Sequence, residues 1–153
     1  MNTPAMNTSA MNAPAQALST RSLPVIAIAV GDPAGIGPEI ALKAALSAET
    51  LALCRPVLVG DRGVIETHAR LCGITAPLVS VQRTRDAVPA GAVALLERQQ
   101  LPPGQLQLGQ IQAAHGLSAI DSARAAVQAG LDGRSEEHTS ELQSRLHLVC
   151  RLL

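Results

Sequence analysis

The sequence predicts an α/β fold in which a partial, mainly parallel β-sheet is flanked by helices. Short apolar runs rich in β-branched residues recur along the chain, and such runs are typical of buried strands. Segments of helical character separate these runs, and glycine or proline residues mark the turns. Because two parallel strands need a crossover connection, strands that alternate with helices favour a parallel sheet.

The first strand is predicted over residues 25–30, which read VIAIAV. A glycine-rich loop at 31–37 follows, and a helix is predicted over 38–53. Pro38 suits the first turn of a helix, and Glu39 complements the positive charge at a helix start. The first unit is therefore a strand, a tight turn and a helix.

The second strand is predicted over 57–60, after Pro56. Asp61 is a suitable cap for the next helix, which is predicted to run to residue 71 or 72 and to end at Gly73. This segment repeats the order of the first unit.

A third strand is predicted over 78–82, a polar loop over 83–91 and a fourth strand over 92–96. Residues 101–112 are expected to be irregular, since they contain two prolines and a glycine within three positions. A last helix begins near Gly116 or Ser118 and ends at Gly133. One apolar face of this helix is marked by Leu117, Ile120, Val127 and Leu131.

The two ends of the chain differ from the rest. Residues 1–22 begin with three imperfect five-residue repeats of small, polar and proline residues, so we expect disorder there. Residues 134–144 read RSEEHTSELQS, which resembles the translation of a common short-read sequencing adapter. We therefore expect 134–153 to be an artefactual tail outside the fold. The alternative is a genuine amphipathic C-terminal helix.

Composition excludes several functional classes. Formal net charge is zero, which gives no electrostatic footprint for nucleic acid or an anionic membrane surface. No apolar run reaches the roughly 18 residues of a membrane span. The three scattered cysteines fit a reducing cytoplasm better than a disulfide framework. Phe, Tyr and Trp are absent, so any core must rely on small and aliphatic side chains and stability should be modest.

The loop at 31–37 is the candidate binding site. Gly31, Gly35 and Gly37 allow positive φ angles and close approach of another group. A helix start presents free N–H groups that can hold a phosphate or another anion. Asp32 can cap the turn or approach a ribose. From physics alone, a tight strand-to-helix turn without a ligand is equally compatible with this pattern, because neither G-x-G-x-x-G nor a Walker lysine is present.

Residues 29–40 read AVGDPAGIGPEI, which resembles the opening motif of the 4-hydroxythreonine-4-phosphate dehydrogenase family. The string is also similar to the shorter GDGIGPE element of isocitrate and isopropylmalate dehydrogenases, which share that fold. The resemblance continues through PVLVGD at 56–61, LCGI at 71–74 and the segment 104–133. It implies that 23–133 form the N-terminal part of a dehydrogenase α/β domain, a fragment of the isocitrate/isopropylmalate dehydrogenase-like fold. Paralogues that act on other four-carbon phosphorylated acids look similar here.

The resemblance also implies an activity. Family members oxidise 4-phosphooxy-L-threonine with NAD in vitamin B6 (pyridoxal phosphate) biosynthesis, a divalent metal polarises the reacting hydroxyl, and the product loses its carboxylate. The implied partners are a phosphorylated small-molecule substrate and a second copy in a homodimer. The family's histidine metal ligands and substrate clamp belong to later segments, so no catalytic or metal-binding residue is assigned in this chain. The cofactor-binding assignment is Gly31, Asp32, Gly35 and Gly37.

The histidines receive structural roles. His68 is expected to be a solvated or capping residue of its helix, and His115 to support the turn into the last helix. His138 and His147 lie in the suspected artefactual tail, and no two histidines have the i, i+4 spacing of a helical metal pair. Lys43 is expected to lie on a solvated helix face. Two functions remain open: an enzyme fragment that is inactive alone, or a stand-alone α/β module that binds a phosphorylated ligand at the glycine turn.

Overall fold

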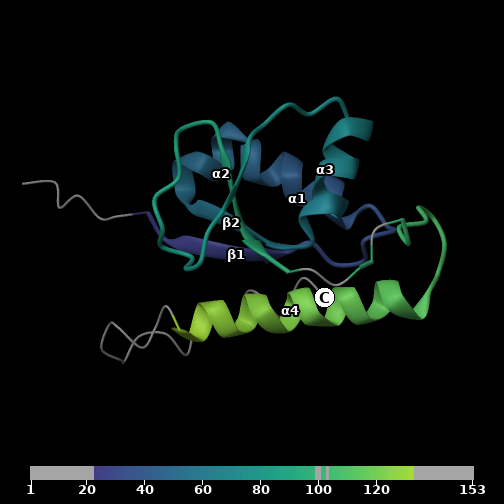
Figure 1. Ribbon diagram of the computed structural model, residues 1–153. Coiled ribbons are helices and arrows are strands. Elements are labelled where there is room, and N and C mark those ends of the chain that lie inside the picture. The colour runs from purple at the N-terminus through teal and green to yellow at the C-terminus, as the bar shows by residue number, and fades with distance from the viewer. Residues whose placement is uncertain (1–22, 99–100, 103, 133–153) are drawn as a thin grey trace, which may run out of the picture.

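The computed structural model describes residues 23–98, 101–102 and 104–132. The tails predicted at 1–22 and 134–153, and the predicted helix end at Gly133, lie outside these residues. The described chain forms a four-stranded sheet with helices on both faces (Figure 1).

All pairings in the sheet are parallel, and the strand order is β1-β2-β4-β3. The strands are β1 (Val25–Ala29), β2 (Arg55–Gly60), β3 (Leu78–Ser80) and β4 (Val93–Glu97). The prediction of an α/β fold with a parallel sheet is therefore confirmed. The three predicted ranges 25–30, 57–60 and 78–82 fall in one sheet, with boundary shifts of one or two residues. Parallel strands place all their carboxyl ends at one edge, which is where the glycine turn lies.

Three helices cover one face of the sheet, and one long helix lies along the other (Figure 1). The first group comprises α1 (Gly37–Leu46), α2 (Ala48–Leu53) and α3 (Arg62–Leu71), and the long helix is α4 (Ala113–Asp132). Between the first group and the sheet lies the main core, which includes the fully buried Leu42, Leu58, Ile65 and Leu95. Each of these positions is aliphatic, as the absence of aromatic residues requires.

The prediction of one continuous helix over 38–53 is wrong. Ser47 adopts an extended conformation, with φ −71° and ψ 136°, and separates α1 from α2. Its hydroxyl accepts a hydrogen bond from the Thr50 N–H at 3.1 Å, so Ser47 is the N-cap of α2. Serine competes for backbone hydrogen bonds at such positions, and this preference outweighed the helical pattern around it.

The predicted capping of α3 is confirmed. Asp61 Oδ1 accepts hydrogen bonds from the backbone N–H groups of Gly63 at 2.7 Å and Val64 at 3.4 Å. At the other end, Gly73 has a φ of +66°, the left-handed conformation that ends many helices. Local sequence signals therefore set both ends of this helix.

Helix α4 packs on β1 and β2 with its small and polar face. Its buried residues are His115, Ser118 and Ser122. The apolar face recognised in the sequence points away from the sheet and is exposed: Leu117, Ile120, Val127 and Leu131. The apolar face of a surface helix normally covers the core. In α4 the small and polar face covers the sheet instead, and the apolar face is exposed. The helix also begins three to five residues earlier than expected.

Candidate functional site

The glycine turn connects the carboxyl end of β1 to the start of α1. Gly31 has a φ of +73°, so a glycine is needed there for the chain to leave the strand. The Ala34 N–H donates to Asp32 Oδ1 at 2.9 Å, and the Gly35 N–H donates to the Asp32 carbonyl at 3.1 Å. Asp32 thus caps the turn, the first of the two roles expected for it.

Gly35 and Gly37 differ in how much space is left for a side chain. A Cβ at Gly37 would lie 2.3 Å from the Val30 carbonyl oxygen, so the start of α1 touches the end of β1 directly. A Cβ at Gly35 would meet only Asp32 atoms at ordinary distances of 3.6 Å or more, and its φ is not positive. Within the described protein nothing requires glycine at position 35. The space beside it is therefore compatible with the close approach of a ligand.

Two carbonyl groups of the turn bind distant parts of the chain. The Pro33 carbonyl lies 2.9 Å from His68 Nε2 on α3. The Ala34 carbonyl accepts a hydrogen bond from the Gly109 N–H at 2.8 Å, in the irregular segment before α4. His68 is only 6% exposed, so the expectation of a solvated or capping histidine is wrong. The sequence carries no signal for this contact, because Pro33 and His68 are 35 residues apart.

Helix α1 begins without a side-chain cap. Ile36 occupies the N-cap position and makes no capping hydrogen bond. Glu39 in the first turn forms an ion pair with Lys43, and this hydrogen bond is the main reason that the pKa of Glu39 is lowered. Lys43 is largely exposed, as expected. Pro38 has no N–H, and the Ile40 N–H donates to the Ile36 carbonyl. The N–H groups of Gly37 and Glu39 are therefore the ones at this helix start that lack a side-chain acceptor among the described residues, and the helix dipole favours an anion there.

The carboxyl end of β2 lies next to the glycine turn. Asp61, directly after β2, caps α3 with one carboxylate oxygen and accepts the Leu101 N–H at 3.3 Å with the other. Gly60 packs against Val30, because a Cβ at Gly60 would lie 2.4 Å from Val30 Cγ2. The carboxyl ends of β1 and β2 thus approach each other closely.

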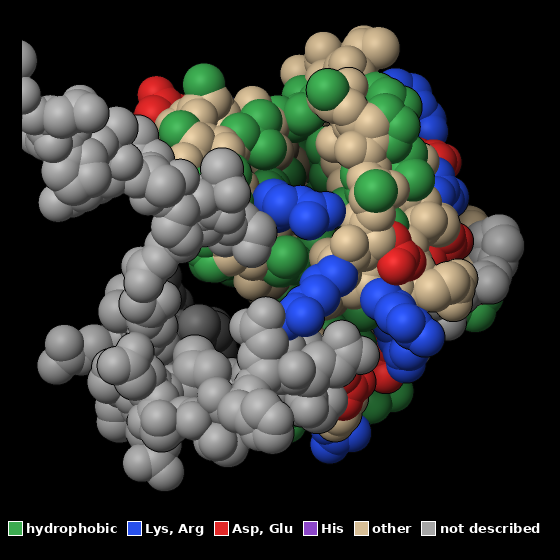
Figure 2. Space-filling view, turned by 90° about the vertical axis from the view of Figure 1, so that its left-hand side faces the viewer, with side chains coloured by type: hydrophobic (Ala, Val, Ile, Leu, Met, Phe, Trp, Pro, Cys, Tyr) green, Lys and Arg blue, Asp and Glu red, His purple; other side chains and the backbone are tan. Residues whose placement is uncertain are grey.

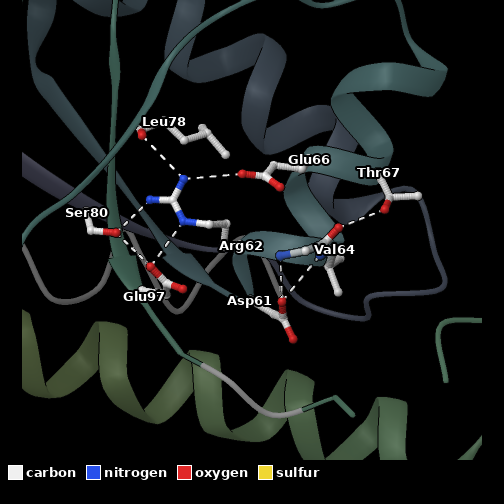
Figure 3. Close-up of polar contacts among 9 residues, drawn as sticks. Asp61, Arg62, Val64, Glu66, Thr67, Leu78, Ser80 and Glu97 are labelled. Atoms are coloured by element: carbon white, nitrogen blue, oxygen red, sulfur yellow. Dashed lines mark hydrogen bonds and ion pairs between the residues drawn. The ribbon is translucent and has the colours of Figure 1, made fainter. Parts of the chain in front are cut away.

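Arg62 forms a polar cluster at the ends of β3 and β4 (Figure 3). Its guanidinium donates to Glu97 Oε2 at 3.2 Å, Glu66 Oε1 at 3.3 Å, Ser80 Oγ at 2.6 Å and the Leu78 carbonyl at 3.4 Å. The pKa of Glu97 is lowered, first by the hydrogen bond from Ser80 and then by Arg62. Because four of its five N–H donors are already bound, Arg62 stabilises the fold rather than offering a free anion site.

Helix α4 is joined to the end of β4 by a bidentate ion pair. Arg98 donates to the two carboxylate oxygens of Asp121 at 2.8 and 3.2 Å, and this hydrogen bonding lowers the pKa of Asp121. Before α4, the ring nitrogens of the buried His115 lie 3.1 and 3.3 Å from the carbonyls of Gln110 and Gln105. The structural turn role expected for His115 is thereby confirmed.

Other features of the described residues do not add to this site. A cavity of about 320 Å³ lies at the amino ends of β2 and β4, lined mainly by aliphatic residues with Arg55 and Asp86. Figure 2 shows Lys and Arg side chains between hydrophobic ones on the face seen from the left of Figure 1. Over the part of the chain that the structure covers, no three His, Cys, Asp or Glu side chains are grouped so that they could hold a metal ion. No helix in that part is long and apolar enough to cross a membrane.

The chain is similar in sequence to curated bacterial proteins that share one provisional name. It is 37% identical over 118 residues to a protein of Symbiobacterium thermophilum that carries the provisional name D-threonate 4-phosphate dehydrogenase. It is 30% identical over 111 residues to a protein of Clostridium botulinum with the same provisional name. These matches cover 76% and 72% of this chain but only 35% and 33% of the relatives. No protein-family model matches the chain.

Solved structures likewise match about three quarters of this chain and about a third of their own length. The fold matches a 4-hydroxythreonine-4-phosphate dehydrogenase from Burkholderia phymatum with a TM-score of 0.67 and 28% identity, over 73% of this chain and 34% of that one. A protein from Klebsiella pneumoniae with the same name gives a TM-score of 0.65 and 28% identity, over 72% and 34%. The chain therefore spans about a third of the length of the proteins that it matches.

Proposed function

Because the chain belongs by homology to the 4-hydroxythreonine-4-phosphate and D-threonate 4-phosphate dehydrogenase family, over about a third of those proteins' length, we propose that it is the N-terminal part of an NAD-dependent dehydrogenase. The substrate class is a four-carbon phosphorylated acid. The observation that carries this proposal is the glycine turn, which lies at the carboxyl edge of a parallel sheet and leads into a helix without a side-chain cap.

We assign Gly31, Asp32, Gly35 and Gly37 to one edge of the NAD site. The uncapped N–H groups of α1 suit the cofactor's pyrophosphate, and Gly35 leaves room for its approach. One carboxylate oxygen of Asp32 holds the Ala34 N–H, and the second is available for a ribose hydroxyl. NAD supplies hydride acceptance when bound, and these residues serve to bind and orient it.

Two substrates are compatible with the names of the relatives. One is 4-phosphooxy-L-threonine, whose oxidation and decarboxylation belong to vitamin B6 biosynthesis, and the other is D-threonate 4-phosphate. A phosphate-binding α/β module without dehydrogenase activity is the second functional class, and the same glycine turn supports it. We favour the dehydrogenase because both the sequence and the structural relatives are named as dehydrogenases.

The remaining parts of the proposal depend on residues beyond those described. A divalent metal would polarise the reacting hydroxyl. The described residues do not fit a metal, so its ligands would lie elsewhere in a family-length polypeptide. We further propose a cytoplasmic homodimer, a domain over 23–133, a dispensable tail at 1–22 and an artefactual tail at 134–153.

The test compares the 153-residue chain with a version that continues after codon 133 in the genomic reading frame. Both are assayed for reduction of NAD with each of the two substrates, across a range of divalent metal concentrations. We expect the 153-residue chain to show no turnover, because it supplies only one edge of the cofactor site, and the continued version to show metal-dependent turnover. Metal-dependent turnover by the 153-residue chain would contradict our placement of the site. Phosphate binding without NAD binding in both versions would favour the binding module.

A further inference from the structure

The peptide group between Pro33 and Ala34 is fixed at both of its polar atoms. Its carbonyl oxygen lies 2.9 Å from His68 Nε2, and its N–H donates to Asp32 Oδ1 at 2.9 Å. A carbonyl is only an acceptor, so His68 Nε2 must carry the hydrogen of this bond. His68 comes from α3, which is separated from the turn in sequence by two helices and a strand, and its side chain is buried.

The neighbouring carbonyls of the turn are fixed in the same way. The Asp32 carbonyl accepts the Gly35 N–H, and the Ala34 carbonyl accepts the Gly109 N–H. Three consecutive carbonyl oxygens, at 32, 33 and 34, are thus bound by donors of the protein itself. This arrangement matters for an anionic ligand, because a carbonyl that pointed into the site would repel a phosphate, whereas N–H groups attract it.

From this geometry we propose that His68 is a positioning residue for the anion site: it holds the Pro33 carbonyl turned toward α3, so that this carbonyl does not face the phosphate of a ligand at the start of α1. The proposal rests on the proposed function of the glycine turn as a phosphate-binding element. His68 does not contact the ligand. It acts through Pro33, whose backbone could rotate if the bond from His68 were missing.

The experiment uses two substitutions of His68 that differ in hydrogen-bonding capacity. In His68→Gln the side-chain amide nitrogen can occupy the position of Nε2 and donate to Pro33. In His68→Leu the side chain becomes apolar at similar bulk, so the Pro33 carbonyl has no donor. Thr67→Ala is the matched control, because Thr67 is the neighbouring residue on the same helix, is only half-buried and bonds to the Gly63 carbonyl rather than to the turn.

All four proteins are prepared as the 153-residue chain, labelled with ¹⁵N and titrated with NAD and, separately, with inorganic pyrophosphate. Amide exchange is followed for the turn at Gly35 and Gly37 and for the strand β2 at Leu58 and Val59. We expect His68→Leu to weaken pyrophosphate and NAD binding by about tenfold, the consequence of an unsatisfied buried carbonyl. Exchange should rise at the turn and stay unchanged in β2, and the Gln variant should bind within about threefold of the unsubstituted chain.

The binding and exchange results test the role of His68 separately from the phosphate-binding function of the turn. If His68→Leu binds both probes as the unsubstituted chain does, or if the Leu and Gln variants lose affinity equally, the positioning role is refuted. If exchange rises throughout β2 as well, His68 serves packing of the whole domain and the proposal fails. If the unsubstituted chain binds neither probe, the proposed function of the turn fails instead. In that case the exchange of Gly35 and Gly37 in the two variants still decides whether His68 orders the turn.

Discussion

Gly37 and Gly35 lie two residues apart in the same turn, yet the structure predicts opposite effects of adding one methyl group. At Gly37 the new Cβ would lie 2.3 Å from the Val30 carbonyl oxygen, whereas real Cβ contacts essentially never fall below 3.0 Å. The start of α1 and the end of β1 must therefore separate by at least 0.7 Å. Both atoms that clash belong to rigid positions, since one is on the backbone and the other is fixed by the helix.

The cost of this separation follows from the packing around it. Val30 and the α1 residues Ala41, Leu42 and Ala45 belong to one buried cluster. Moving the helix start loosens that cluster, and forced overpacking of this kind costs about 1–3 kcal/mol. We expect Gly37→Ala to destabilise the domain by about 2 kcal/mol. Gly35→Ala meets only ordinary contacts at a non-positive φ, so its effect should stay within about 0.5 kcal/mol.

The assay must suit a chain that contains no Trp, Tyr or Phe. Intrinsic fluorescence is absent, so urea unfolding is followed by far-ultraviolet circular dichroism, with protein concentration determined from peptide-bond absorbance. The midpoint and slope are measured for the unsubstituted chain and both variants. Equal midpoints for Gly37→Ala and the unsubstituted chain would refute the reasoning, and so would equal losses in the two variants. Weakened NAD binding by a stable Gly35→Ala protein would in addition support the assignment of that glycine to ligand approach.

Three further predictions concern the helices. Ser47→Ala should cost about 1 kcal/mol in urea unfolding because α2 loses its N-cap, and an unchanged midpoint would mean that the cap contributes nothing. The pKa of Asp121 is lowered in the folded chain by Arg98, so this ion pair stabilises the fold above the unfolded pKa of about 3.9 and loses its effect as pH falls through the lower folded value. Asp121→Asn should therefore cost up to about 1 kcal/mol at neutral pH and progressively less below pH 4, whereas a cost independent of pH would exclude the ion pair as its source. On α4, Ser122→Leu should destabilise by about 1–3 kcal/mol because Ser122 faces the sheet, while Leu117→Gln should change stability by less than about 0.5 kcal/mol; the reverse order in urea midpoints would show that α4 packs by its apolar face.

The sequence was sufficient for features that depend on neighbouring residues. The strand at 25–30, the glycine turn and the Asp61 cap each follow from side chains within a few positions of one another. Contacts across long separations were not predictable in the same way. His68 in a helix has the same local sequence whether it faces water or Pro33, and only the packing of α3 beside the turn decides between them.

The orientation of α4 shows a second limit. Apolar spacing identified Leu117, Ile120, Val127 and Leu131 as one face, and they do share a face, but the periodicity does not state which face meets the sheet. In this helix the buried residues are His115, Ser118 and Ser122, and the Arg98–Asp121 ion pair joins the helix to the residue after β4. Within the described residues, α4 therefore packs by its small and polar face, and its apolar residues lie on the exposed face.

The parallel register of the sheet also sets the order in which the chain can fold during synthesis. All three pairings among the described strands are parallel, so none of these strands forms a hairpin with the strand that follows it. β3 leaves the ribosome before β4 yet pairs only with β4, which lies between β2 and β3. Until residue 97 has emerged, β2 therefore exposes an unpaired edge next to an unpaired β3. The interval between synthesis of β3 and completion of β4 is when a nascent chain of this fold is most exposed to pairing with a neighbouring polypeptide.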